Sequence, residues 1–197
     1  MGQYYTALII REEEVKAYRP KYAMKLTEHS WFTNNLTEKV MSELYGRPAK
    51  VAWIGDYANY DDDVFGMDSH EEYIEMYDRA WPDGEHNSDV IEIDLDNDDP
   101  IDFSIKNIKK MSVINHSKKV YIDLGEYINM SEKNSDWGVM FPISLLTACG
   151  NDRGCGDYHS GTCFEYVGTW AFDTIEVSEL CNVPEGYKKQ DICFIEN

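Results

Sequence analysis

Short apolar segments alternate with polar turns along most of the chain, and this pattern predicts more strands than helices. Segments 4–10 (YYTALII) and 15–18 are apolar or β-branched and are separated by the polar turn REEE, which predicts a β-hairpin. A short apolar strand is predicted at 50–54, and alternating polarity predicts an edge strand at 90–95. Two apolar stretches within 111–124 flank NHSKK and predict a second hairpin.

The last third of the chain contains the most hydrophobic stretch, 139–149 (VMFPISLLTAC), which leads directly into a glycine-rich loop. We expect this stretch to form a buried strand. Further strands are predicted at 163–172, 174–180 and 191–196 because these segments are rich in aromatic and β-branched residues.

Apolar positions recur at helical spacing in two places. Segment 35–44 carries an apolar face and is followed by Gly46 and Pro48, and segment 69–81 carries a second stripe that ends before Pro82. Two helices and about seven to nine short strands, many of them joined by hairpins, predict an α+β fold with a mainly antiparallel sheet. The chain of 197 residues fits a single domain, 1–197.

The negative charge is concentrated in one part of the chain. The formal net charge is −19, and residues 56–102 hold 18 acidic residues and one basic residue, Arg79, which gives this segment a charge of −17. The other 150 residues hold 19 acidic and 17 basic residues and are nearly neutral. This difference predicts that the domain carries an acidic insertion at about 56–102.

Three interpretations of the acidic insertion remain open from its composition. A local excess of carboxylates attracts basic proteins and repels nucleic acid, so a basic protein partner is expected and direct nucleic-acid binding is not. The alternatives are a solvated segment that keeps the protein soluble, and weak, non-specific association of a divalent cation. The acidic residues expected to contact a basic partner are Asp61, Asp62, Asp63, Glu71, Glu72, Glu75, Asp94, Asp96 and Asp98.

The glycine-rich loop at 150–161 (GNDRGCGDYHSG) is the second unusual feature. It lacks the lysine and the following helix of a phosphate-binding P-loop, so nucleotide binding by that route is excluded. Backbone amides around Arg153 are able to hold an anion, whereas Asp152 and Asp157 favour a loop whose own acids bind its amides. The sequence leaves a structural loop and a ligand-binding loop as equal alternatives.

Six motifs occur in an order that resembles a family of small, uncharacterised bacterial and phage proteins. They are MGQYY, KLTEHSW, WIGDYA, INHSKKVYID, LLTACGNDRGCGDY and VGTWAFD. The resemblance covers most of the chain outside about 60–108, and Cys155 stands where the family has glycine. The resemblance implies a bacterial or phage origin and no particular reaction. It also implies a shared ligand-binding site that contains Asp56, Asn115, His116, Asn151, Arg153 and Asp157.

Two functional hypotheses follow. The first is a soluble binding or inhibitory protein, encoded by a bacterium or a phage, whose acidic segment engages a basic host protein that handles nucleic acid or acts in defence. The second is a small hydrolase or nucleotide- or small-ligand-binding protein that uses the 150–158 loop, with or without a metal ion. Catalytic residues and oligomeric state cannot be assigned from the sequence.

The cysteine pattern and the lengths of the apolar segments predict the cellular location of the protein and whether it holds a metal or cofactor. The five cysteines include no C-x-x-C pair, and no apolar run reaches the roughly 20 residues of a membrane helix. We therefore expect a cytoplasmic protein with reduced thiols, no metal site and no cofactor.

Overall fold

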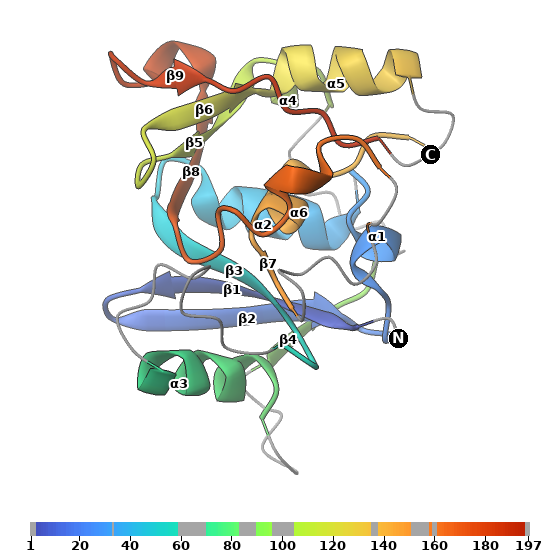
Figure 1. The fold of residues 1–197 in the computed structure, drawn as a ribbon, viewed down its shortest axis with the longest axis vertical. Helices are drawn as coiled ribbons and strands as arrows, with labels where there is room; N and C mark the ends of the chain where they lie inside the picture. Colours follow the sequence, from blue (N-terminus) through green and yellow to red (C-terminus); the bar gives the residue numbers. More distant parts are fainter. Residues whose placement is uncertain are drawn as a thin grey trace.

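The computed structural model has an α+β fold built on one nine-stranded sheet (Figure 1). The structure describes residues 3–32, 34–58, 70–82, 90–95, 105–134, 138–150, 158 and 161–195. The strand order is β4-β2-β1-β3-β8-β5-β6-β9, and β7 pairs with β3 beside this path. The strands are β1 Tyr5–Arg11, β2 Glu14–Pro20, β3 Ala49–Gly55, β4 Val90–Ile93, β5 Met111–Asn115, β6 Val120–Asp123, β7 Ala148–Cys149, β8 Thr174–Glu179 and β9 Lys188–Lys189. The helices are α1 Leu26–His29, α2 Asn35–Leu44, α3 His70–Ala80, α4 Ile105–Ile108, α5 Leu124–Asn134 and α6 Pro142–Leu146.

Both predicted hairpins are confirmed. Strands β1 and β2 pair antiparallel from Arg11 opposite Glu14 to Ala7 opposite Tyr18, and β5 and β6 pair antiparallel on either side of the NHSKK turn. Strand β4 lies at the edge of the sheet beside β2, as its alternating polarity predicts. Each of these elements has a local signal in the sequence, either a polar turn or an alternation of side chains.

The expected mainly antiparallel sheet is wrong, because the sheet is mixed. Strand β4 runs parallel to β2, β7 runs parallel to β3, and β9 runs parallel to β6. A hairpin turn in the sequence predicts pairing only between the two strands that it joins. Parallel partners are joined by long connections, so no turn motif in the sequence predicts their pairing.

The expectation of two helices is also wrong, since α1, α4, α5 and α6 accompany α2 and α3. The hydrophobic stretch 139–149 forms α6 and only a two-residue strand, β7, because Pro142 occupies the first turn of a helix, where its fixed φ is favourable. Segment 163–172 contains a 3₁₀ turn instead of a strand, and residues 191–195 are not a strand.

The sheet buries a separate apolar core on each face. Ile9 points to the face that packs against α2, α5 and α6, whereas Leu8 and Ile54 point to the face that packs against Met76 and Ala80 of α3. This follows from the alternation of side chains along a strand. Figure 1 shows α2 and α3 on opposite sides of β1 and β2.

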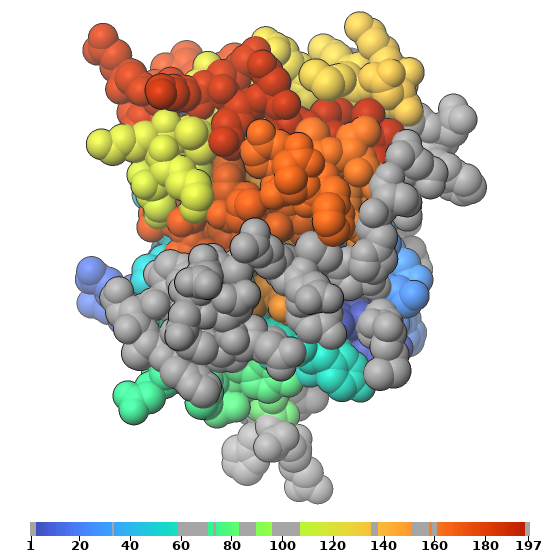
Figure 2. Space-filling view, viewed as in Figure 1, coloured from blue at the N-terminus to red at the C-terminus, as the bar shows by residue number. Residues whose placement is uncertain are grey.

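The described parts of the predicted acidic insertion belong to the folded body. Helix α3 covers one face of β1 and β2, and β4 extends the sheet. In the space-filling view α3 (green) lies at the lower surface, at the opposite end of the molecule from α5 (Figure 2). None of the helices that the structure describes is both long and apolar enough to span a bilayer.

Candidate functional site

Strands β3 and β7 run parallel and end together, which brings two sequence-predicted features to the same place. Trp53 pairs with Ala148 and Ile54 with Cys149, so Asp56 and Gly150 follow neighbouring strand ends. The carboxyl ends of parallel strands are common positions for ligand sites in α/β sheets. The structure thus places Asp56 beside the start of the glycine-rich loop.

Asp56 is held by hydrogen bonds from two other elements. The Tyr4 amide donates to Asp56 Oδ1 at 3.0 Å, and the Asp56 amide donates to the Tyr4 carbonyl at 2.9 Å. The Tyr77 hydroxyl of α3 donates to the Asp56 carbonyl at 2.7 Å. Burial raises the pKa of the Asp56 carboxyl, and the hydrogen bond from the Tyr4 amide opposes this shift.

The buried side chain of Gln3 explains why residues 55 and 150 are glycines. A Cβ at Gly150 would lie 2.8 Å from Gln3 Oε1 and 2.7 Å from Tyr5 Oη. A Cβ at Gly55 would overlap the same Gln3 amide. Both glycines therefore make room for Gln3, and the first glycine of the loop has a packing role.

Asn151, Arg153 and Asp157 lie outside the described residues, so their role in ligand binding stays a prediction. The described flanks of the loop are Gly150 and Tyr158. Tyr158 is buried, and its hydroxyl oxygen lies 2.9 and 3.0 Å from the carbonyl oxygens of Thr162 and Ile195, which share its one proton.

Asn115 and His116 lie at the other end of β3 from Asp56. Asn115 is opposite Ile175 of β8, and Ile175 is opposite Ala49 at the start of β3. The length of β3 separates this position from Asp56, which corresponds to about 20 Å at roughly 3.3 Å per residue. The structure does not bring Asp56 and His116 into one site.

Asn115 holds the turn between β5 and β6. Its side chain is fully buried and donates from Nδ2 to Asp173 Oδ2 at 2.7 Å, while its Oδ1 accepts from the Lys118 amide at 2.9 Å. The Lys118 ammonium forms an ion pair with the same Asp173 oxygen. These contacts satisfy the buried polar groups of the turn and fix its conformation.

His116 lies between a carboxylate and a phenol. Its Nε2 is 2.7 Å from Glu176 Oε2 on β8, and its Nδ1 is 3.1 Å from Tyr187 Oη. The His116 side chain is 25% exposed and that of Glu176 is 17% exposed. The sequence indicates His116 but neither partner, because both partners are about sixty or more residues away.

The acidic residues of α3 face outward. Glu71, Glu75 and Asp78 are exposed, and they lie with Ile74 at positions i, i+4, i+7 and i+3 of one helical face. Ile74 is 46% exposed although its neighbours on the other helical face, such as Met76, are buried. Asp61, Asp62, Asp63, Asp96 and Asp98, also predicted to contact a partner, lie outside the described residues.

Several of the predicted partner-binding acids have cationic neighbours. Glu72 lies 3.6 Å from the Lys50 ammonium, and Asp94 lies 3.3 Å from the Lys21 ammonium. Glu75 pairs with Arg79 on the same helix at 3.6 Å. The first two pairs bring cations from outside the acidic segment, so the charge of −17 is partly neutralised within the fold.

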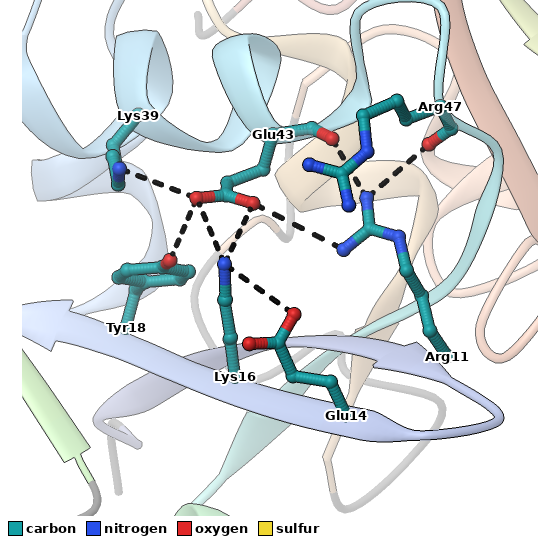
Figure 3. Close-up of polar contacts among 7 residues, drawn as sticks. All are labelled: Arg11, Glu14, Lys16, Tyr18, Lys39, Glu43 and Arg47. Carbon is teal, nitrogen blue, oxygen red and sulfur yellow. Dashed lines mark hydrogen bonds and ion pairs between the residues drawn. The ribbon is translucent and has the colours of Figure 1, made fainter.

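A polar cluster that the sequence does not reveal surrounds Glu43 of α2 (Figure 3). The Lys16 and Lys39 ammonium groups each lie 3.2 Å from a Glu43 carboxylate oxygen, and the Tyr18 hydroxyl donates to Oε1 at 3.1 Å. Arg11 Nη2 donates to the Glu43 carbonyl at 2.7 Å, near the C-terminus of α2. The cluster fastens α2 to the β1–β2 hairpin.

The cluster shifts the pKa values of Glu43 and Tyr18. Burial opposes ionisation of Glu43, but hydrogen bonds from Lys16, Lys39 and Tyr18 outweigh burial, so the pKa of Glu43 is lowered. Burial and the adjacent Glu43 charge raise the pKa of Tyr18 well above its ordinary value. At neutral pH Glu43 is therefore ionised and Tyr18 is neutral. We assign the cluster a structural role.

The described residues contain no group of three histidine, cysteine, aspartate or glutamate side chains arranged to hold a metal ion. Burial raises the pKa of the Cys149 thiol well above its ordinary value and raises the pKa of Cys193 to about 11. Neither thiol is a nucleophile at neutral pH, because nucleophilic cysteines react as thiolates.

No protein-family model matches this chain, and neither the curated proteins nor the solved structures give a match.

Proposed function

We propose that this is an acidic binding protein that engages a basic protein partner through residues 56–102, with the outer face of α3 as the contact surface. The proposed partner is a host protein that handles nucleic acid or acts in defence, and the proposed outcome is inhibition. The observation that carries the proposal is the position of Ile74, which is exposed and is surrounded on the same helical face by Glu71, Glu75 and Asp78.

An apolar centre with a charged rim is the usual anatomy of a protein-binding surface. The apolar centre gains free energy when it is removed from water, and the rim carboxylates select a partner of opposite charge. Glu71 and Asp78 form no ion pair with any residue that the structure describes, so their charges are available to a partner.

The ion pairs restrict the proposal to α3. Glu72 and Asp94 already lie beside Lys50 and Lys21, and Glu92 accepts from Arg19 Nη2 at 2.9 Å. The pairs at Glu92 and Asp94 make β4 a weaker candidate for the contact surface, and the pair at Glu72 leaves Glu71, Glu75 and Asp78 as the candidate acids of α3.

The test uses a defined basic probe, a 20-residue helical peptide rich in lysine and arginine, and measures its affinity by fluorescence anisotropy at two salt concentrations. The triple variant Glu71→Gln, Glu75→Gln, Asp78→Asn should weaken binding, and raised salt should weaken binding of the unmodified protein. The matched control changes three exposed acids outside the segment, Glu12→Gln, Glu13→Gln and Glu185→Gln. Equal losses in the two triple variants would mean that α3 is not the contact surface.

Ile74→Ser separates a specific surface from simple charge attraction. This substitution leaves the charge unchanged and removes the apolar centre, so a specific docking surface loses affinity. An unchanged affinity would show that the peptide binds only by its charge.

A second candidate is a small-ligand or hydrolase site at the ends of β3 and β7, supported by the placement of Asp56 beside Gly150. Its proposed ligand groups are Asp56 and the loop residues Asn151, Arg153 and Asp157. Nucleotides with magnesium or manganese should raise the melting temperature of the protein, and Asp56→Asn and Arg153→Ala should abolish that rise. A rise that survives both substitutions would place the site elsewhere.

A further inference from the structure

We propose that Tyr187 is a nucleophile activated by His116, that Glu176 positions the imidazole, and that the three form a reactive site for an electrophilic acyl or sulfonyl compound. The site lies at the turn of the β5–β6 hairpin, and the proposal does not depend on the proposed partner binding.

The hydrogen bonds determine which nitrogen of His116 carries the proton. An ionised carboxylate only accepts hydrogen bonds, so the 2.7 Å contact with Glu176 Oε2 requires a proton on Nε2. In the neutral imidazole, Nδ1 is then an acceptor, and the Tyr187 hydroxyl 3.1 Å away donates to it. The order carboxylate, imidazole and hydroxyl is the arrangement that activates a hydroxyl nucleophile.

Three segments of the chain hold this geometry. The His116 amide donates to the Thr174 carbonyl at 2.9 Å, which fixes the start of the turn against β8. Glu176 lies within β8 opposite Ile114 of β5. The Tyr187 amide donates to the Pro184 carbonyl at 3.2 Å, and its ring meets the His116 ring edge to face at a centroid distance of 5.8 Å.

The buried contacts beneath the turn support the same geometry. Asn115, Asp173 and Lys118 form a connected network directly beside His116. A nucleophile and its base need such a preformed support, because small displacements reduce the reaction rate strongly. Tyr187 is half-buried and the His116 side chain is 25% exposed, so neither side chain is enclosed in the core.

An arylsulfonyl fluoride is the probe for this site. The Tyr187 oxygen attacks sulfur, an S–O bond forms and the S–F bond breaks. The phenolic proton passes to His116 Nδ1 and then to solvent, and fluoride leaves. No oxidant or reductant takes part in the step.

The first experiment treats the unmodified protein with benzenesulfonyl fluoride at pH 7 and measures the labelling rate of each tyrosine by peptide mass spectrometry. Tyr22 and Tyr57 are internal controls, because they are 65% and 54% exposed. A general base contributes on the order of 100-fold or more, so Tyr187 should react about 100 times faster than Tyr22. A Tyr187 rate equal to or below that of Tyr22 would overturn the proposal.

The second experiment identifies the base and the positioning residue. His116→Gln should reduce labelling of Tyr187 to the rate of Tyr22, and Glu176→Gln should reduce it while Glu176→Asp restores part of it. Labelling of Tyr22 and Tyr57 should not change in these variants. Labelling of Tyr187 that is unaffected by His116→Gln would overturn the proposal.

Discussion

His29 and Trp53 stack in the core with ring centroids 6.0 Å apart and an interplanar angle of 13°, and neither ring has a hydrogen-bond partner for its nitrogens among the described residues. Both side chains are fully buried. A buried polar atom without a partner is costly, and a charged one costs much more. His29 is therefore neutral in the folded protein, and burial lowers its pKa from 6.5 to about 3.

Acid should destabilise the protein through His29. The unfolded chain binds a proton at His29 below about pH 6.5, whereas the folded protein does so only near pH 3. The free energy of unfolding therefore has its full value above pH 6.5 and decreases as the pH falls from 6.5 toward 3. The loss is about 1.4 kcal/mol per pH unit over that interval. Urea unfolding between pH 8 and pH 4 measures it.

The variant His29→Phe keeps a ring beside Trp53 and removes the titration. Its stability should depend less on pH than that of the unmodified protein below pH 6.5, and the two should differ by a constant amount above pH 7. Parallel stability curves over the whole range would show that His29 is not responsible.

Glu43→Gln should cost about 3 kcal/mol of unfolding free energy. The Glu43 side chain is 9% exposed and neutralises Lys16 and Lys39, so its loss leaves cations without their buried counter-charge. The control is Glu75→Gln, whose side chain is 62% exposed and pairs only with Arg79 among the described residues. The control should change stability by less than about 0.5 kcal/mol. Similar effects of the two substitutions in denaturant unfolding would contradict the structural role of Glu43.

Gly150→Ala should destabilise the protein by about 1–3 kcal/mol because the new methyl group overlaps Gln3 and Tyr5. Shortening Gln3 relieves part of this overlap. In a double-mutant cycle, Gln3→Ala and Gly150→Ala should therefore cost less together than the sum of their separate effects. Additive effects would mean that Gln3 does not occupy the space beside Gly150.

Asn115→Ala should cost about 1–3 kcal/mol, because it removes one hydrogen bond to Asp173 and leaves the Lys118 amide without its side-chain acceptor. Asn134 is a matched control, since its side chain donates to the Met130 carbonyl at 2.7 Å in an exposed position. Asn134→Ala should change the melting temperature little. Equal shifts for the two substitutions would remove the case for a rigid β5–β6 turn.

Local signals in the sequence predicted much of the fold. The REEE and NHSKK turns predicted both hairpins, and the apolar stripe ending before Pro82 predicted α3. The parallel partners of β2, β3 and β6 could not be predicted, because each pairing joins segments that share no turn. The same limit explains α6, where a continuous apolar run does not distinguish a buried helix from a buried strand.

The candidate sites were predictable only in part, for the same reason. The family resemblance pointed to Asp56 and His116 as members of one site, but their separation by the length of β3 depends on long-range pairing. Glu43 carries one local signal, Lys39 at i−4, whereas Lys16, Tyr18 and Arg11 reach it only through the fold.

Strand β8 lies in the middle of the sheet although it is among the last strands in the chain. In the sheet, β8 lies between β3 and β5 and so joins the N-terminal strands to the β5–β6 hairpin. Its pairing with β3 involves only Ala49 and Lys50 of that strand. During synthesis, therefore, the two halves of the sheet are made long before the strand that unites them. The sheet is continuous only once Thr174–Glu179 has been made, so until then the facing edges of β3 and β5 lack the strand that pairs with both.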